Sequence, residues 1–551
     1  MMPPDSPFVQ TRRQLLRTAA AASAITVVAP ELLQQLAWAK TTGALNGTFP
    51  DGIASGDPTP SSIVLWTRLG NAKAKGTVTL EVATDKAFKK LVTTSKVQTG
   101  PQVNGAVKAQ VSKLKPYEEY FYRFGSKGHD SAVGRFRTAL PAGSKQPVNF
   151  AFWSCQDYTH GYYNALTHLN KQDLDFVVCL GDYIYAEAYH TLADKTAIRD
   201  DRIGTVLDGY NEGRPVALTL ADYRKKYSLY RTDADLRTMH EQFAFVSLWD
   251  DHEVQDNYAG GAGADGGLPA VQKYSVARRK AGYQAWAENM PTFGAGKGKG
   301  SKIYRRLQFG STVDLIIMDQ RQYRANQPCD DAIAPACADW DQPRDFLGKT
   351  QMAWLKDQLS KSKASWKVMA NELTIMPTQV LGTPPAFFTF DGWQGYPQER
   401  EELLNHIDTK GIKDVVFVTG DIHTFIAGDV QRGFDGKGKV VATEFVGGST
   451  TSQGLGETDI DAGGGVKLTG NDAHPATSPA IIDVLRGINP WVESADFDKH
   501  GYGLVKADPT GFDCTLVRMS TIKQQTTKTE PSKGWRWKIP RGAAGTHGHA
   551  V

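Results

Sequence analysis

The sequence predicts an α+β protein in which a small N-terminal β-sandwich precedes a larger, layered α/β domain. Between about residues 48 and 138, short stretches rich in β-branched and aromatic residues alternate with Gly, Pro and Lys clusters. Farther along, apolar strand-like runs alternate with amphipathic stretches of helix length. The 551 residues are enough for two such domains, each with its own core.

Composition places the chain among ordinary folded proteins. It is 40% hydrophobic and 22% charged, and its formal net charge is only +4. This charge gives no reason to expect nucleic-acid binding, although nucleotides or nucleic acid could still be substrates. After the N-terminal region, no segment is long and apolar enough to span a bilayer, so we expect no transmembrane segment in the mature chain.

The first 39 residues have the pattern of an export signal. Arg12 and Arg13 precede an apolar stretch, which ends in Ala37-Trp38-Ala39. A twin arginine, an apolar run and an A-x-A site are typical of a Tat signal peptide, since the run is shorter than the ~20 residues of a membrane span. We therefore expect the Tat machinery to export the protein to the periplasm or the medium, and exclude residues 1–39 from the fold.

Residues 40–140 are predicted to form an immunoglobulin-like or fibronectin-like sandwich. Its strand-like stretches are SIVLWTRL, GTVTLEVA, AQVSKL, EYFYRFG and AVGRFRT, and about 90 residues is a usual size for this architecture. The stretch LPAGSKQP at 140–147 reads as a linker.

Residues 141–525 are predicted to form the α/β domain. Helix-length amphipathic stretches cover 161–170, 219–232, 271–289, 349–362 and 397–409. The Gly-rich stretches 259–269 and 294–301 are predicted surface loops. They lack the GKS/T sequence of a phosphate-binding loop, and neither follows a strand. Residues 526–551 are predicted to be a C-terminal tail, of which the last stretch, RGAAGTHGHAV at 541–551, is frayed.

The five cysteines fall into different settings. Cys329 and Cys337 lie close together in one loop, and in an oxidising compartment we expect them to form a disulfide. Cys179 and Cys514 lie within strand-like runs and read as core thiols. Cys155 lies where an apolar strand meets a polar cluster, so a structural role does not account for it as readily.

Polar residues with metal-binding side chains follow five apolar, strand-like runs. These runs end at Cys155-Gln156-Asp157, Gly181-Asp182-Tyr183-Ile184-Tyr185, Asp250-Asp251-His252-Glu253, Asn371-Glu372 and Gly420-Asp421-Ile422-His423, and Asp256-Asn257 follow the third. In open α/β sheets, ligands bind at the carboxyl ends of strands. We therefore expect the five ends to converge on one crevice.

Carboxylates that converge in a crevice repel one another unless a cation compensates them. The mixed oxygen, nitrogen and sulfur donors suit a transition metal, beside which oxygens could hold a harder cation. Tyr185 lies three residues after Asp182, so its phenolate could join the same ion. Since a trivalent ion best stabilises anionic phenolate and thiolate, iron(III) is the predicted metal.

Each cluster taken alone has a simpler explanation. An Asp after a strand usually caps a helix or turn, and a lone Cys, His or Tyr is usually part of the core. A cysteine hydrolase, with Cys155 paired to His252 or His423, is a second possibility, but it leaves the carboxylates unexplained. No G-x-S-x-G sequence is present to indicate a serine hydrolase.

As an ordered set, SCQD, GDYIY, WDDHEVQDN, NELTIM and GDIHTF resemble the sequences of PhoD-type alkaline phosphatases. FPDGIASGDPTPSSIVLWTRL at 49–69 adds to this resemblance, which covers nearly the whole mature chain. Some secreted phospholipase D-like phosphodiesterases share the architecture. The resemblance implies an Ig-like domain followed by an α/β/β/α metallophosphoesterase sandwich.

It also implies a centre that binds Fe(III) together with Ca²⁺. By motif position, Cys155, Asp182 and Tyr185 would be the iron ligands, and Asp182 would bridge to calcium.

The remaining assignments also come from the resemblance. Asn257 and Asp421 would complete the cation sites, with His423 beside Asp421 as a ligand or phosphate contact. Asp251, as a further metal ligand, and His252 belong to a motif that lines the site.

The expected reaction is hydrolysis of phosphate monoesters, diesters or both at alkaline pH. A cation lowers the pKa of bound water, and the resulting hydroxide attacks phosphorus in line. His423 or His252 would protonate the leaving oxygen, and Asn371 would orient the phosphate or another ligand.

Two other functions stay open at this point. One is a phospholipase D-like phosphodiesterase that acts on lipid head groups, with the aromatic stretch 384–396 at its mouth. The other is a non-catalytic exported binding protein that uses the Ig-like domain.

Overall fold

The computed structural model of the chain describes most of its residues. The exceptions are 1–24, 29–42, 193–196, 208–210, 260–274, 293–301, 332–333, 383–384, 388, 458–459, 462–466 and 469–477. The twin arginine and the predicted cleavage site therefore lie outside the described residues, as do most of the two Gly-rich stretches. Among the residues that are described, no helix combines the length and the apolar character needed to cross a membrane.

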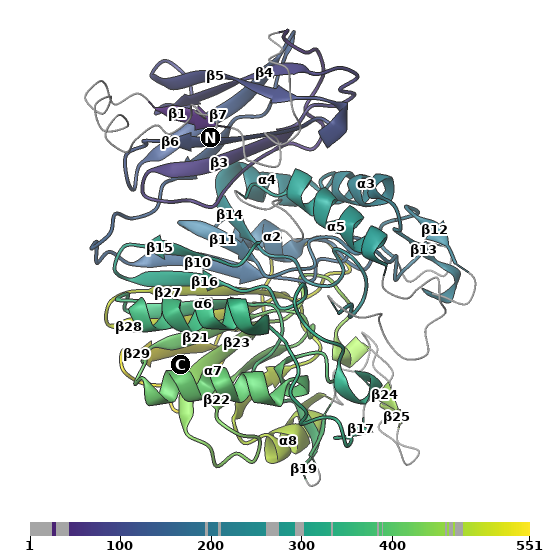
Figure 1. Cartoon of the computed structure of the whole chain (residues 1–551), viewed down its shortest axis with the longest axis vertical. Coiled ribbons are helices and arrows are strands. Elements are labelled where there is room, and N and C mark those ends of the chain that lie inside the picture. The colour runs from purple at the N-terminus through teal and green to yellow at the C-terminus, as the bar shows by residue number, and fades with distance from the viewer. Residues whose placement is uncertain are drawn as a thin grey trace, which may run out of the picture.

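The N-terminal domain is the predicted β-sandwich (Figure 1). One sheet has the strand order β5 (Leu91–Thr99), β4 (Gly76–Ala83), β7 (Glu119–Ser126) and β8 (His129–Asp130), and β9 (Gly134–Arg137) also pairs with β7. The facing strands are β1 (Thr26–Val28), β6 (Ala106–Ser112), β3 (Ser62–Arg68) and β2 (Ile53–Gly56). Leu65, Leu80 and Tyr122 belong to the core between them. Strand β1 falls inside the predicted signal segment and pairs with β6.

The sandwich shares a sheet with the second domain. Strand β2 pairs in parallel with β14 (Ala244–Ser247), so the predicted boundary near residue 140 is bridged by strand pairing. The resulting ten-stranded sheet continues through β11 (Phe176–Cys179), β10 (Val148–Trp153), β27 (Gly501–Ala507), β28 (Gly511–Arg518) and β29 (Arg536–Pro540).

Strand β29 belongs to the ten-stranded sheet, although residues 526–551 were predicted to be a tail outside the domain. It pairs antiparallel with β28, and its alternate residues Trp537 and Ile539 are buried. The indole of Trp537 lies 5.5 Å from the ring of Phe445 in the facing sheet. The segment is ordered because this alternation gives the strand one apolar face.

A seven-stranded sheet faces the ten-stranded one. Its order is β15 (Arg305–Phe309), β16 (Val313–Ile317), β18 (Trp366–Asn371), β21 (Val415–Thr419), β23 (Val440–Gly447), β22 (Phe425–Gln431) and β26 (Val492–Asp496). Phe152, Val418 and Phe445 belong to the core between the sheets.

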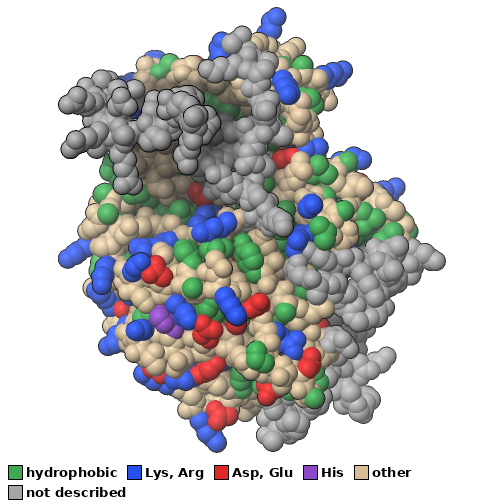
Figure 2. All heavy atoms as spheres, in the orientation of Figure 1, with side chains coloured by type: hydrophobic (Ala, Val, Ile, Leu, Met, Phe, Trp, Pro, Cys, Tyr) green, Lys and Arg blue, Asp and Glu red, His purple; other side chains and the backbone are tan. Residues whose placement is uncertain are grey.

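Helices cover the two outer faces. Helices α6 (Gly348–Lys361) and α7 (Pro397–Thr409) lie on the seven-stranded sheet, where Leu355 and Leu404 share a core with Phe417 (Figure 1). Figure 2 shows Lys, Arg, Asp and Glu side chains mixed over the outward side of this layer. Helices α2 (Asn164–Leu169), α3 (Leu220–Tyr230), α4 (Ala234–Gln242) and α5 (Val276–Asn289) lie on the other side.

The α+β fold class, with an α/β/β/α sandwich, is thereby confirmed. All five predicted helical stretches contain a helix, whereas α4 and α8 (Ser478–Ile488) were not predicted. Short strand pairs in the loops were also not predicted. They are β12 (Thr205–Val206) with β13 (Pro215–Val216), β17 (Ala334–Pro335) and β19 (Gln379–Gly382) with β20 (Pro385–Phe387), and β24 (Ile460–Asp461) with β25 (Lys467–Leu468).

Candidate metal centre

Four of the five predicted strand ends meet at one place between the two sheets. Strands β10, β11 and β14 run parallel in adjacent positions of one sheet, and β18 and β21 run parallel in the other. Their carboxyl ends therefore lie at a common edge of the sandwich, as the strand-end argument predicts. Cys155, Asp182, Asp251 and Asp421 follow four of these strands and belong to connected groups of metal-competent side chains.

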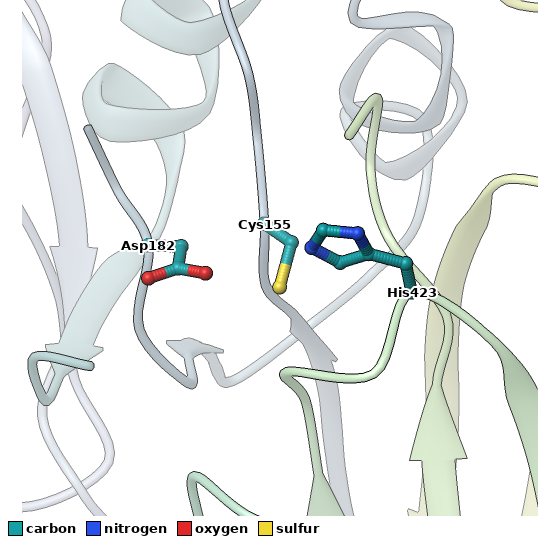
Figure 3. A group of neighbouring side chains, drawn as sticks. All are labelled: Cys155, Asp182 and His423. Carbon is teal, nitrogen blue, oxygen red and sulfur yellow. The ribbon is translucent and has the colours of Figure 1, made fainter. Parts of the chain in front are cut away.

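The first group contains a thiol, a carboxylate and an imidazole. Ligand atoms of Cys155, Asp182 and His423 all lie within 4.8 Å of one another, and Figure 3 shows the Cys155 sulfur between the other two side chains. The Tyr185 hydroxyl donates to Asp182 Oδ2 at 3.2 Å and lies 3.1 Å from His423 Nε2. Ser452 Oγ lies 2.6 Å from the same hydroxyl. The structure thus brings together the residues expected to hold iron.

Carboxylates extend this group towards β14. Asp182, Asp251 and His252 form a second cluster, and Asp250, Asp251 and Asp421 form a third, each within 4.8 Å. The backbone N–H of His252 donates to Asp182 Oδ1 at 3.3 Å. Because Asp182 and Asp251 are each shared between clusters, the three sets form one continuous centre.

Asn257 lies at the border of this centre. Its backbone N–H donates to Asp251 Oδ2 at 2.7 Å, and its side-chain amide donates to Asp331 Oδ2 at 3.1 Å. Asp331 belongs to the short helix η3 (Pro328–Asp331), which also carries Cys329. The predicted disulfide joins Cys329 to Cys337 with an S–S distance of 2.04 Å. The disulfide loop thus reaches a residue next to the acidic cluster.

Backbone conformation marks the centre as well. Cys155, Asp182, Asn257, Asp421 and His423 all have left-handed φ values, between 49° and 69°. This region is unfavourable for side chains with a Cβ, and costs of order 1 kcal/mol or more at each position. Such strain persists only where the surrounding structure imposes it, and four of these residues, Cys155, Asp182, Asp421 and His423, belong to the clusters of the centre.

The charges within the centre are not balanced by the protein itself. Burial raises the pKa of the Cys155 thiol and of the Tyr185 phenol well above their ordinary values, and the Asp182 carboxylate raises both further. Burial also raises the pKa of Asp421, with a further contribution from Asp250. A bound cation would lower these pKa values, because it stabilises anionic ligands.

Asp250 gives a direct sign of fit to a cation. Burial, partly offset by Arg321, raises the pKa of Asp250 to about 7. In the part of the chain that the structure describes, its Oδ2 has no hydrogen-bond partner. A buried, unpartnered carboxylate oxygen next to Asp251 and Asp421 is suited to a hard cation, and the sulfur, phenol and imidazole of the first group are suited to a transition metal.

Sequence reasoning missed Arg321, the main cation in this region. It is fully buried, and it contacts Asp250 Oδ1 through Nε, Asp391 Oδ2 at 2.6 Å, Asp251 Oδ1 at 3.2 Å and Asp421 Oδ1 at 3.1 Å. An arginine shared by several carboxylates holds their relative positions while it neutralises part of their charge.

A usable signal for Arg321 was present in the sequence. The apolar run of β16 ends in Met318-Asp319-Gln320-Arg321, which is a sixth strand end followed by polar residues. The rule applied to the other five strands would have found it.

The two histidines differ in protonation. His423 Nδ1 donates to the carbonyl of Gln453 at 2.8 Å, and burial lowers the pKa of His423 to about 4, so Nε2 carries a lone pair near neutral pH. Burial alone would lower the pKa of His252, but Asp251 and Asp182 raise it well above its ordinary value. His252 Nδ1 lies 3.1 Å from Glu187 Oε2, and its ring stacks on Tyr185 with centroids 4.2 Å apart.

Asn371 does not contact this centre, contrary to its expected role as a ligand-orienting group. It is the last residue of β18 and fully buried. Its amide donates to Leu373 O and to Thr419 Oγ1, and its Oδ1 accepts from Gln320 and Trp393. These internal bonds use its polar atoms, so Asn371 stabilises the strand ends below the centre.

The aromatic stretch 384–396 is not an exposed mouth in its described part. Phe387, Phe390, Trp393 and Tyr396 are each at most 1% exposed. These rings pack in the interior, so they offer no exposed surface for a lipid.

The comparisons with known proteins agree with this geometry. The family model described as "PhoD-like phosphatase" matches residues 150–516, and the model of its N-terminal domain matches residues 35–140. Alkaline phosphatase D of Bacillus subtilis (strain 168) is 36% identical over 423 residues, which cover 74% of this chain and 70% of that protein.

Solved structures give the same result. A structure of PhoD superimposes with a TM-score of 0.76 at 29% identity, over 93% of this chain and 95% of that one. A purple acid phosphatase from yellow lupin seeds shares the fold, with a TM-score of 0.53 at 11% identity, over 89% and 74% of the two chains. The matched family region contains the strand ends that form the centre, and the chain therefore belongs to the PhoD-like phosphatase family.

Proposed function

We propose that this protein is an exported, metal-dependent alkaline phosphatase that hydrolyses phosphate monoesters, diesters or both. The observation that carries the proposal is the convergence of Cys155, Asp182, Tyr185, Asp421 and His423 in one buried centre. Stability alone would not bring these side chains together, because buried carboxylates without a compensating positive charge cost free energy.

The residues divide between two kinds of cation. Cys155, Asp182, Tyr185 and His423 supply sulfur, oxygen and nitrogen, which suit iron(III). When bound, such cations lower the pKa of water and neutralise charge that develops on the phosphoryl oxygens.

The second, harder cation is calcium. Its oxygen donors would be Asp182, Asp251, Asn257 and Asp421, and Asp182 would also be one of the iron ligands. Arg321 keeps Asp251 and Asp421 in their relative positions through one guanidinium nitrogen, which lies 3.2 and 3.1 Å from them.

The protein's own proton donor for the reaction is His252. Asp251 and Asp182 raise the pKa of His252, and Glu187 holds Nδ1 and so fixes the ring. Nε2 then lies on the side of Asp251, 3.7 Å from Oδ2, where it can give a proton to the leaving oxygen. His423 has the opposite protonation and serves as a ligand.

Export through the Tat pathway belongs to the same proposal. The twin arginine, the apolar stretch and the A-x-A site support it, and the disulfide agrees with an oxidising compartment. Family membership favours an enzyme over a non-catalytic binding protein, and no described feature favours lipid head groups as substrates.

Metal removal followed by replacement tests the proposal. The purified protein should lose hydrolysis of p-nitrophenyl phosphate and bis-p-nitrophenyl phosphate after exhaustive chelation, and regain it with iron and calcium together. Asp421→Asn should stay inactive after metal replacement. Asp408→Asn is the matched control, because Asp408 pairs with Arg432 and Lys439 away from the centre. Full activity of the metal-free protein would refute the proposal.

A further inference from the structure

Three residues from separate parts of the chain form another group of metal-binding side chains. His160 follows β10, Glu457 ends the short helix η5 (Leu455–Glu457), and His500 directly precedes β27. Their ligand atoms lie within 4.8 Å of one another, and each histidine Nε2 is 3.2 Å from Glu457 Oε2. Zn–N and Zn–O bonds of about 2.0–2.2 Å place neighbouring tetrahedral ligands roughly 3.3 Å apart, so these atoms already have the spacing of ligands to one ion.

His190 is an independent sign of a ligand at this place. Its ring centroid lies 4.2 Å from that of His160, and the residue is only 7% exposed. Its Nε2 has no hydrogen-bond partner in the described part of the chain, and Asp157 Oδ2 is 3.9 Å away. Burial lowers the pKa of His190 to about 4, which leaves a neutral imidazole able to coordinate a metal.

We propose that His160, Glu457 and His500 bind a divalent transition-metal ion, for which zinc is the best match, with the His190 imidazole beside them. Two imidazoles and one carboxylate are a usual zinc donor set. Although burial raises it, His500 and His160 hold the pKa of Glu457 well below its ordinary value, so the carboxylate is ionised. The absence of sulfur from the four residues distinguishes this site from the Cys155 centre.

Lys523 is the group that the ion has to displace. Its Nζ lies 3.0 Å from His160 Nε2 and 3.9 Å from Glu457 Oε1. The side chain is 29% exposed, so the ammonium can turn to solvent when a metal takes its place. The lysine thus supplies a positive charge to Glu457 in the metal-free protein.

The ion would stabilise the segment that supports the first centre. Residues 452–457 place Ser452 2.6 Å from the Tyr185 hydroxyl, and the carbonyl of Gln453 accepts from His423. At the other end of this segment, Glu457 Oε2 accepts from the backbone N–H of Gly454 at 2.9 Å. An ion on Glu457 would therefore hold the turn that positions Tyr185 and His423. The site itself does not depend on the phosphatase reaction.

Zinc binding by a variant with a disabled first centre tests the proposal. In full-length Cys155→Ser/Asp182→Asn protein, stripped of metal and titrated with Zn²⁺ alone, one further substitution at a time is compared. His500→Gln should lose one bound equivalent by metal analysis and calorimetry. His168→Gln should lose none, because His168 bonds to Tyr502 outside the cluster. Zinc-edge X-ray absorption of the parent should show imidazole and oxygen ligands without sulfur.

Lys523→Met gives a second test that does not depend on the loss of a ligand. Removal of the competing ammonium should tighten Zn²⁺ binding by at least about tenfold, or ~1.4 kcal/mol. Equal zinc stoichiometry and equal imidazole scattering in the parent and in His500→Gln would overturn the proposal. Unchanged zinc affinity in Lys523→Met would also overturn it. Neither result bears on phosphatase activity, so failure here is distinct from failure of the proposed function.

Discussion

Removal of the metal ions should make the protein less stable as the pH rises from about 4 to 7, and Asp250 gives the size of the effect. Burial raises the pKa of Asp250 from 3.8 to about 7. A carboxyl with a higher pKa in the folded state binds more protons there than in the unfolded chain, so the free energy of unfolding falls as pH rises between the two values. At about 1.4 kcal/mol per pKa unit, the shift is worth about 4 kcal/mol.

Other groups contribute to the total, so the Asp250 contribution must be isolated. The raised pKa of Asp421 also makes the free energy of unfolding fall as pH rises. The pKa values of His423 and His190, each lowered to about 4, make that free energy rise with pH below neutrality. Asp250→Asn removes only one titrating carboxyl. The asparagine oxygen can still accept from Arg321 Nε, and its amide replaces an oxygen that has no hydrogen-bond partner among the described residues.

Urea unfolding followed by tryptophan fluorescence measures the difference. For the metal-free proteins, the stability of wild type relative to Asp250→Asn should fall by about 2–3 kcal/mol between about pH 5 and 7. Iron and calcium should abolish this difference in slope, because a bound cation compensates the ionised carboxylate. Parallel pH profiles for the two metal-free proteins would refute the charge argument.

Three further variants separate ligand roles from structural ones. Tyr185→Phe removes the hydroxyl beside Asp182. It should lower kcat roughly 10–100-fold and abolish any visible phenolate-to-iron absorption. An unchanged spectrum of the iron-loaded enzyme would contradict this. Asn371→Ala should destabilise the protein by about 2–4 kcal/mol in urea unfolding and leave KM unaltered, because it leaves the buried side chains of Gln320 and Trp393 without their hydrogen-bond acceptor. A loss of kcat at unchanged stability would count against the structural role. Serine at both Cys329 and Cys337 should cost about 2–3 kcal/mol, measured in the same way, and no loss of stability would show that the disulfide contributes nothing.

Periodicity was sufficient to predict the two-domain architecture but not how the domains join. Alternation and helical spacing are local properties, and they located strands such as β3 and β4 and all five expected helices. The pairing of β2 with β14 depends on which strand edges remain open after each domain folds, and no local pattern encodes it. Strand β29 was missed because its Trp537 and Ile539 alternate with charged residues in a short segment with many glycines on its C-terminal side.

Four of the strand ends chosen by the strand-end rule lie together in the fold, whereas Asn371 lies outside the group, and the backbone explains the difference. Cys155, Asp182 and Asp421 lie two or three residues beyond the ends of their strands, at positive φ. Asn371 is still inside β18, where it is bonded to the strand end of β21 through Thr419. A side chain within a strand must point to one face of the sheet, whereas a residue in the left-handed conformation just past the end can turn back over the edge. The residues that can bind a ligand are therefore those beyond the last hydrogen bond of the strand ladder. A strand-end rule limited to such positions would have rejected Asn371 and kept Arg321, which follows β16 by four residues.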